Sequence, residues 1–196
     1  MNPSILDAIR EEAKTLTIAR RSLPVWTERG LEEYSSTLHS TGLTYWTHIG
    51  ASLGYTAIAE MPAPQSGPYA FAGDDVRNDS VWLAPERWDA AVLVEFERYR
   101  GQADEDKLLK KMENLLLAYH RWAQRPTALI LCYWTKGLAS LPNHDRLRRR
   151  VKEGFQTAAK ESVHGSVTCR VAFFQAVLQE TGDRLWRLAQ LIERGV

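Results

Sequence analysis

Three carboxylates in two neighbouring segments have the types and spacing that suit a divalent metal ion. Glu95 and Glu97 end the apolar run 90–99 (AAVLVEFERY). Because side chains alternate along a strand, both carboxylates lie on one face, roughly 6.5 to 7 Å apart. Asp79 precedes a second β-prone segment, 80–84, and the start of one strand lies beside the end of the next in an antiparallel hairpin. The three carboxylates are therefore expected to converge as hard oxygen ligands for Mg²⁺ or Mn²⁺.

A metal ion held there would support hydrolysis of a phosphodiester bond. The ion lowers the pKa of a bound water and neutralises phosphate oxygens. Glu97 would then serve as a ligand or as a base for that water. Without metal, three neighbouring carboxylates repel one another, so at least one is expected to have a raised pKa. Such a cost indicates a functional role for the cluster.

Cations and aromatic residues follow the same segments. The helix predicted after strand 127–134 carries the run RLRRRVK, which would hold phosphates without reading bases; a solvated helix face is the alternative. The cations that we expect at nucleic acid are Lys107, Lys111, Lys136, Arg146, Arg149 and Arg150. Trp82 and Trp88 offer stacking surfaces unless they pack in the core. Asp74 and Asp75 compete with Asp79 for the metal position unless they only form a turn.

Apolar periodicity predicts the elements that must position these residues. The clearest helix spans 104–122, where Leu108, Met112, Leu115, Tyr119 and Trp122 advance by steps of four and three. The predicted helices are 2–22, 26–38 and 43–53 (the last two closed by Gly42 and Gly54), 104–122, 143–160 and 183–194. The predicted strands are 55–61, 80–84, 90–99, 127–134 and 167–174, with a loop at 61–73 that contains a short extended piece at 69–71. This order predicts an α/β fold with a mixed sheet flanked by helices.

The arrangement D-x(15)-E-x-E, with D79-S-V-W-L on one strand and V92-L-V-E-F-E97 on the next, resembles the PD-(D/E)xK nuclease superfamily. The resemblance covers residues 43–134 and implies a restriction-endonuclease-like core. It implies that Asp79 and Glu95 hold the metal. A carboxylate from the upstream helix or first strand often joins them in that family, and Glu60 is the candidate here.

The sequence departs from the family pattern at two positions. Asn78 stands where the family usually has Pro, and Glu97 stands where it usually has Lys. Some restriction enzymes of this fold carry Glu there, and some relatives that have lost the third residue are inactive. Other relatives supply the lysine from the following helix, where Lys107, Lys110 and Lys111 are available.

Length and composition agree with one compact domain. The chain has 196 residues, 44% of them hydrophobic and 25% charged, with a formal net charge of +1. No apolar run approaches the roughly 20 residues of a membrane span, and the N-terminus lacks the apolar stretch of a signal peptide, so a cytoplasmic protein is expected. Two cysteines cannot build a disulfide scaffold or a four-thiolate zinc site. The five histidines have no metal-ligand spacing and receive no role.

The sequence thus predicts a Mg²⁺- or Mn²⁺-dependent nuclease, with a DNA endonuclease favoured. A catalytically inactive nuclease-fold subunit that binds or scaffolds a DNA-processing complex is the alternative, and an RNA-cleaving enzyme on the same fold is a third. We expect residues 43–196 to form the core and residues 1–42 to form a helical extension, through which the chain forms a homodimer or docks to a larger complex. Sequence does not separate DNA from RNA or endonuclease from exonuclease action.

Overall fold

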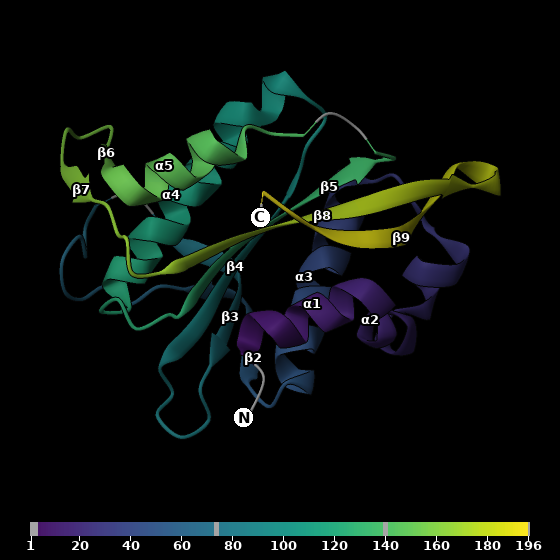
Figure 1. The fold of residues 1–196 in the computed structure, drawn as a ribbon, viewed down its shortest axis with the longest axis horizontal. Helices are drawn as coiled ribbons and strands as arrows, with labels where there is room; N and C mark the ends of the chain where they lie inside the picture. Colours follow the sequence, from purple (N-terminus) through teal and green to yellow (C-terminus); the bar gives the residue numbers. More distant parts are fainter. Residues whose placement is uncertain (1–3, 73–74, 139–140, 196) are drawn as a thin grey trace.

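A seven-stranded mixed sheet forms the centre of the protein (Figure 1). The computed structural model describes residues 4–72, 75–138 and 141–195. The helices are α1 (Ile5–Thr15), α2 (Thr17–Ser22), α3 (Ser35–Ser52), α4 (Glu105–Arg121) and α5 (His144–Glu153), with short helical turns η1 (Val25–Arg29), η2 (Gln102–Asp104) and η3 (Gly182–Arg184). The strands are β1 (Leu31–Glu32), β2 (Thr56–Pro62), β3 (Arg77–Leu83), β4 (Ala90–Arg98), β5 (Ala128–Lys136), β6 (Gly154–Gln156), β7 (Ser162–His164), β8 (Arg170–Thr181) and β9 (Leu185–Arg194).

The sheet combines an antiparallel meander with parallel strands. Its order is β1-β9-β8-β5-β4-β3-β2, while β6 and β7 form a separate ribbon. β2, β3 and β4 are antiparallel neighbours, β4, β5 and β8 run parallel, and β9 returns antiparallel to β8. The predicted hairpin of β3 and β4 and the predicted central position of β5 are both confirmed.

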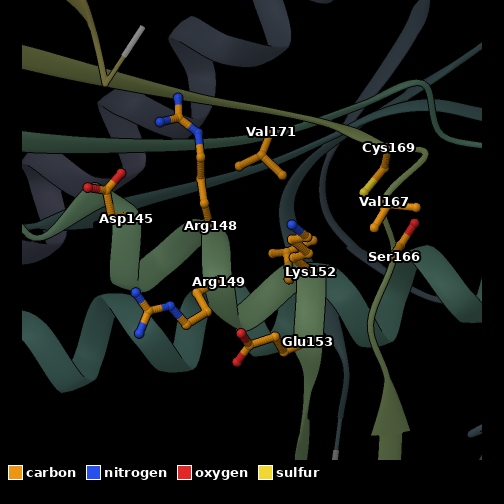
Figure 2. Close-up of a pocket in the computed structure, with 10 residues that line it drawn as sticks. Asp145, Arg148, Arg149, Lys152, Glu153, Ser166, Val167, Cys169 and Val171 are labelled. Carbon is orange, nitrogen blue, oxygen red and sulfur yellow. The ribbon is translucent and has the colours of Figure 1, made fainter.

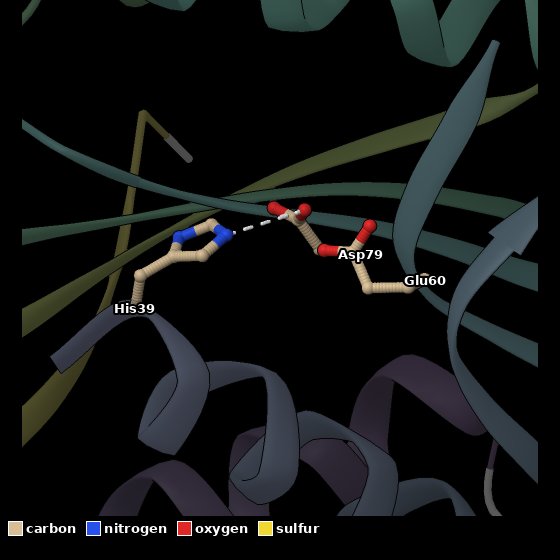
Figure 3. Close-up of side chains that lie close together, drawn as sticks. All are labelled: His39, Glu60 and Asp79. Atoms are coloured by element: carbon tan, nitrogen blue, oxygen red, sulfur yellow. Dashed lines mark ion pairs between the residues drawn. The ribbon is translucent and has the colours of Figure 1, made fainter. Parts of the chain in front are cut away.

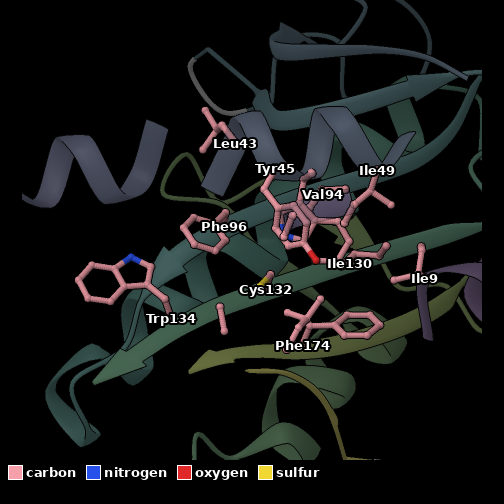
Figure 4. Close-up of a cluster of buried hydrophobic side chains, with 14 of the residues drawn as sticks. Ile9, Leu43, Tyr45, Ile49, Val94, Phe96, Ile130, Cys132, Trp134 and Phe174 are labelled. Atoms are coloured by element: carbon pink, nitrogen blue, oxygen red, sulfur yellow. The ribbon is translucent and has the colours of Figure 1, made fainter. Parts of the chain in front are cut away.

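Helices cover both faces of the sheet, with α1, α2 and α3 on one face and α4 and α5 on the other (Figure 1). Alternate residues of β4 point to opposite faces. Val94 and Phe96 pack in the core beneath α3, which Figure 4 shows, while Leu93 packs beneath α4. The same alternation places Glu95 and Glu97 on the face covered by α4.

Gly42 lies inside α3, where the sequence predicted a break between two helices. A Cβ at this position would come within 2.0–2.4 Å of the Phe96 ring. The glycine therefore lets the helix approach β4 closely rather than ending it. The predicted helix 26–38 is interrupted in the structure, because the helical turn Val25–Arg29 leads into β1 and α3 begins only at Ser35. The boundary expected at residue 42 falls within one continuous helix.

The C-terminal segment is the strand β9, whereas the sequence predicted a helix over 183–194. Its apolar residues do recur at helical steps of three and four. However, β9 pairs with β8 from Leu185 opposite Thr181 to Arg194 opposite Phe173. Without this partner, β8 would expose a long edge of unpaired backbone groups. Pairing to the sheet outweighs the local helix propensity.

The predicted helix 2–22 is two helices, and its residues 2 and 3 lie outside the described residues. Leu16 separates α1 from α2 with a left-handed backbone, at a φ of 52°. The buried carboxylate of Glu12 accepts hydrogen bonds from the backbone N–H groups of Ile18 and Ala19. Glu12 thereby satisfies donors at the start of α2 and stabilises the break.

Three further boundaries differ from the predictions. α5 ends at Glu153 rather than near residue 160, because Gly154 has a φ of 85° and begins β6. β8 starts at Arg170 and runs past the predicted segment 167–174 to Thr181. Residues 69–71 form a turn instead of an extended piece.

The N-terminal helices α1 and α2 pack onto the sheet of the same chain. Leu6, Ile9, Leu16 and Ala19 are buried in the core that also contains Phe174. Dimerisation through these helices stays a prediction, and it would use their outward-facing polar sides. Within the described residues, none of the helices combines the length and apolar character that crossing a membrane requires.

Candidate functional site

Asp79 and Glu95 meet where β3 and β4 stop pairing. The pairing of the two strands ends at Ser80, which lies opposite Val94. Beyond that point the side chain of Asp79 replaces a backbone partner, because its Oδ2 accepts a hydrogen bond of 2.7 Å from the backbone N of Phe96. The start of β3 and the end of β4 thus converge as the hairpin arrangement predicted.

Lys111 from α4 bridges the two carboxylates. Its Nζ lies 2.6 Å from Oε2 of Glu95 and 3.5 Å from Oδ2 of Asp79. The other oxygen of Glu95, Oε1, accepts hydrogen bonds from Nδ2 of Asn78 at 2.9 Å and of Asn114 at 2.6 Å. Glu95 has no solvent exposure, so four neighbouring side chains determine its electrostatic environment.

Glu97 continues the same face of β4 and pairs with a second lysine. Its Oε1 accepts hydrogen bonds of 2.7 Å from Nζ of Lys107 and from the backbone N of Arg98. Lys107 and Lys111 are one turn apart, about 6 Å along the helix axis. Glu95 and Glu97 are about 6.6 Å apart along the strand. Because these spacings match, α4 supplies one lysine for each glutamate.

The electrostatics of the cluster follow from burial and mutual repulsion. Burial, together with the negative charge of Asp79, raises the pKa of Glu95 to about 8, although Lys111 and Asn78 oppose the rise. The expectation of a raised carboxyl pKa is confirmed. Burial acts to lower the pKa of Lys111, but Glu95 and Asp79 outweigh it and raise that pKa above its ordinary value.

The metal-free protein is expected to lose stability as the pH rises from about 4.5 to about 8. In that window the folded state keeps the proton on Glu95, whose pKa is about 8, while the unfolded chain has lost it, since its pKa there is 4.5. The folded state binds more protons, so the free energy of unfolding falls with pH, by at most about 1.4 kcal/mol per pH unit. Urea unfolding in EDTA would measure this slope for wild type and for Glu95→Gln. The difference between the two proteins isolates Glu95, and equal slopes would contradict the assignment.

Glu60 and His39 approach Asp79 from β2 and α3 (Figure 3). Their ligand atoms and one oxygen of Asp79 all lie within 4.8 Å of one another, and Nε2 of His39 is 3.6 Å from Oδ1 of Asp79. Glu60 has a left-handed φ of 53°, and such strain in a non-glycine residue clusters at functional sites. The structure therefore brings Glu60 to Asp79 as expected, and it adds His39, to which the sequence gave no role.

The donor set fits a divalent ion with mixed oxygen and nitrogen ligands. Ligand atoms that share one Mg²⁺ ion lie at most about 4.2 Å apart, so small side-chain movements would complete a site from His39, Glu60 and Asp79. The imidazole makes the set less suited to Mg²⁺ than carboxylates alone, because imidazole is a ligand that transition-metal ions prefer. Oδ1 of Asn78, beside Asp79 in the chain, is buried without a hydrogen-bond partner in the described structure, and a bound water or ion would satisfy it.

The other predicted cations contact groups other than Asp79, Glu95 and Glu97. Lys136 pairs with Glu33 and lies over the Trp186 ring, at 4.3 Å from the ring centroid. Arg146 and Arg150 form ion pairs with Asp106 and Glu113 of α4, at 2.8 and 3.6 Å. Arg149 lines a separate hollow of about 590 Å³ between α5 and the start of β8, together with Arg148 and Lys152 (Figure 2). Of the six cations expected at nucleic acid, Lys107 and Lys111 join the carboxylates.

The structure also shows where the tryptophans and the alternative aspartates of the sequence prediction lie. Trp82 is fully buried and belongs to the core, so it offers no stacking surface. Trp88 is 62% exposed, but it lies in the connection at the other end of the β3–β4 hairpin. Asp75 is exposed and pairs with Arg77 at 2.5 Å. Asp74 lies outside the described residues.

Two residues of the site, Asn114 and His39, were not predicted from the sequence, for different reasons. Asn114 follows Lys107 and Lys111 at helical steps of four and three, so the periodicity of α4 contained the signal for it. His39 had no such signal, because the predicted helix ended at Leu38. No protein-family model, curated protein or solved structure matches this chain. The function is therefore inferred from the fold and from the geometry of the site.

Proposed function

We propose that this protein is a metal-dependent nuclease that hydrolyses phosphodiester bonds, most readily in DNA, on a restriction-endonuclease-like core. The run α3, β2, β3, β4, α4, β5 supports the proposal, because it consists of a helix, an antiparallel meander, a second helix and a parallel strand. This run includes the whole segment that resembles the PD-(D/E)xK superfamily.

The single observation that carries the proposal is the bridge from Lys111 to Asp79 and Glu95. The usual strand lysine of the superfamily is Glu97 here, and a helix lysine at the same carboxylates supplies the missing cation. The end of this strand pair contains two buried carboxylates, one lysine and an unsatisfied amide oxygen. Such a group lowers the stability of the fold, which indicates a functional role for it.

Each residue has a chemical role in this proposal. Asp79, Glu60 and His39 would hold the metal, with Glu95 next to Asp79 across the Lys111 bridge. A bound Mn²⁺ or Mg²⁺ would lower the pKa of a water molecule and neutralise phosphate oxygens. Glu95 would release its proton as the metal binds, because a nearby divalent cation favours the ionised form of a carboxylate. Lys111 would contribute positive charge to the phosphate, and Glu97 would serve as a ligand or as a base.

The test is cleavage of supercoiled plasmid, linear duplex DNA, single-stranded DNA and RNA by the purified protein. Each substrate is incubated with Mn²⁺, Mg²⁺ or EDTA, and the Asp79→Asn protein is purified in parallel to detect a contaminating nuclease. Cutting that needs metal and is lost in Asp79→Asn is the expected result. A wild-type protein that leaves all four substrates intact would overturn the proposal.

The ion pairs of the cluster favour one second candidate, a nuclease-like fold that acts as a binding or scaffolding subunit. Lys111 and Lys107 compensate Glu95 and Glu97 without any metal ion. A decayed site that kept these ion pairs would be stable and would have no need of an ion. The two candidates differ in whether a divalent ion stabilises the fold.

Mn²⁺ is expected to raise the thermal unfolding temperature of the wild-type protein. An ion that binds the folded state at 100 times its Kd adds about 2.7 kcal/mol of stability. For a chain of this size that corresponds to about 5 to 10 °C. Glu60→Gln and His39→Ala should reduce the shift, whereas Glu161→Gln, at an exposed position in the β6–β7 ribbon, should leave it unchanged. A wild-type protein that gains nothing from Mn²⁺ would favour the scaffold.

We also propose a cytoplasmic location and association of the outer sides of α1 and α2 with a second copy or a larger complex. The support for this association is the position of these helices before the segment that resembles the superfamily. Their apolar sides are buried in the chain's own core, so the contact would be polar.

A further inference from the structure

A cavity of about 390 Å³ adjoins the candidate site along α4. Its helix side is lined by Lys110, Asn114 and Leu117. Its other side is lined by Phe71, from the loop between β2 and β3, and by Phe155, from the β6–β7 ribbon. Leu117 and Phe155 are buried, while Lys110 at the rim is 76% exposed. The cavity thus combines an apolar floor with a cation at its opening.

Phe71 is held at this cavity on an anchored loop, with 90% of its surface exposed. The guanidinium of Arg121, which is itself buried, donates hydrogen bonds to the backbone oxygens of Tyr69 at 3.0 Å and Ala72 at 2.8 Å. Ala72 is buried, and Tyr69 packs edge-on against His120. Because the backbone on both sides of Phe71 is held by these contacts, the loop presents the exposed ring at the cavity.

Two side chains connect the cavity to the proposed metal site. Asn114 lines the cavity and donates to Glu95 at 2.6 Å. Arg77 lies between Asp75, which lines the cavity, and Glu60, at 2.5 and 3.9 Å. Arg77 also compensates the negative charge of Asp75. A nucleotide with its phosphate near Glu60 and Arg77 could therefore extend its base into the cavity.

We propose that this cavity receives an unstacked base of single-stranded DNA, next to the phosphate that is cut, with the base stacked on Phe71. The inference deepens the proposed nuclease function and depends on it for the identity of the phosphate. A base inside a duplex cannot reach such a pocket without leaving the stack, which costs free energy. A single strand has no such cost, and its bases stack readily on an exposed aromatic ring. Single strands and frayed ends are thus the preferred substrates.

The experiment measures binding and cleavage separately. Fluorescence anisotropy of a short labelled oligonucleotide, as a single strand and as a duplex, gives Kd in EDTA. Phe71→Ala should weaken single-strand binding by about 5- to 150-fold, the value of one stacked base. Phe71→Trp keeps an aromatic face and should bind like wild type. Trp88→Ala removes another exposed aromatic residue, at the far end of the hairpin, and should change nothing.

Cleavage with Mn²⁺ distinguishes failure of this inference from failure of the nuclease function. If Phe71→Ala binds and cuts single strands as wild type does, or if wild type binds duplex as tightly as single strand, the inference is overturned while a metal-dependent nuclease stands. If Phe71 is needed for single-strand binding but no metal supports cutting, the base pocket stands and the nuclease function is overturned.

Discussion

Asp79→Asn is expected to lower metal-dependent cleavage by about 10³-fold or more while the protein stays folded. Loss of one ligand charge removes metal-ion catalysis that is worth several kcal/mol. Asparagine has the shape of aspartate and keeps an oxygen that accepts the hydrogen bond from the backbone N of Phe96. The substitution also removes the repulsion that helps to raise the pKa of Glu95, so stability in EDTA should not fall.

Asp89→Asn is the matched control for this prediction. Asp89 lies at the other end of the same hairpin, where it pairs with Arg125. Initial rates with Mn²⁺ and thermal unfolding in EDTA are measured for both variants. The catalytic role of Asp79 is contradicted if the two variants cut equally fast, or if Asp79→Asn loses activity only because it unfolds.

The carboxylates could be predicted from sequence because their positions follow from strand geometry alone. A period of two puts Glu95 and Glu97 on one face, and an antiparallel hairpin puts Asp79 beside Glu95, while Glu97 lies further along β4 and pairs with Lys107. Choosing among the lysines of the next helix needed one more fact, the face of α4 that meets the sheet. Lys107 and Lys111 are on that face, whereas Lys110 lies at the rim of the neighbouring cavity.

The remaining parts depend on contacts between segments far apart in the chain. In the sequence Gly42 resembles a helix end, but in the structure it is a glycine because the ring of Phe96 on β4 leaves no room for a Cβ. That interpretation divided α3 and separated His39 from the core. β9 has a helical apolar pattern but pairs with the edge of β8. In both cases a tertiary contact outweighs a local preference that the sequence displays.

Lys111→Met is expected to destabilise the metal-free protein by about 3 kcal/mol at alkaline pH. Removing one member of a buried ion pair leaves the other charge uncompensated, a loss of about 3 to 5 kcal/mol, and partial exposure of Lys111 places it at the lower end. Glu95 can relieve the cost by keeping its proton, because its pKa is already about 8. The destabilisation should therefore shrink toward pH 5.5. Urea unfolding in EDTA across this range gives the measurement.

Lys110→Met provides the control, because Lys110 is the neighbouring lysine on α4 and its side chain is 76% exposed. Its substitution should change stability by less than about 0.5 kcal/mol at any pH. Adding Mn²⁺ to Lys111→Met tests the same charge balance from the other side. A divalent ion held by His39, Glu60 and Asp79, next to Glu95, replaces the lost ammonium charge, so a nuclease site should recover stability with metal, and a scaffold whose ion pairs are purely structural should not. Equal unfolding curves for the two lysine variants would remove the bridge from Lys111 as support for either function.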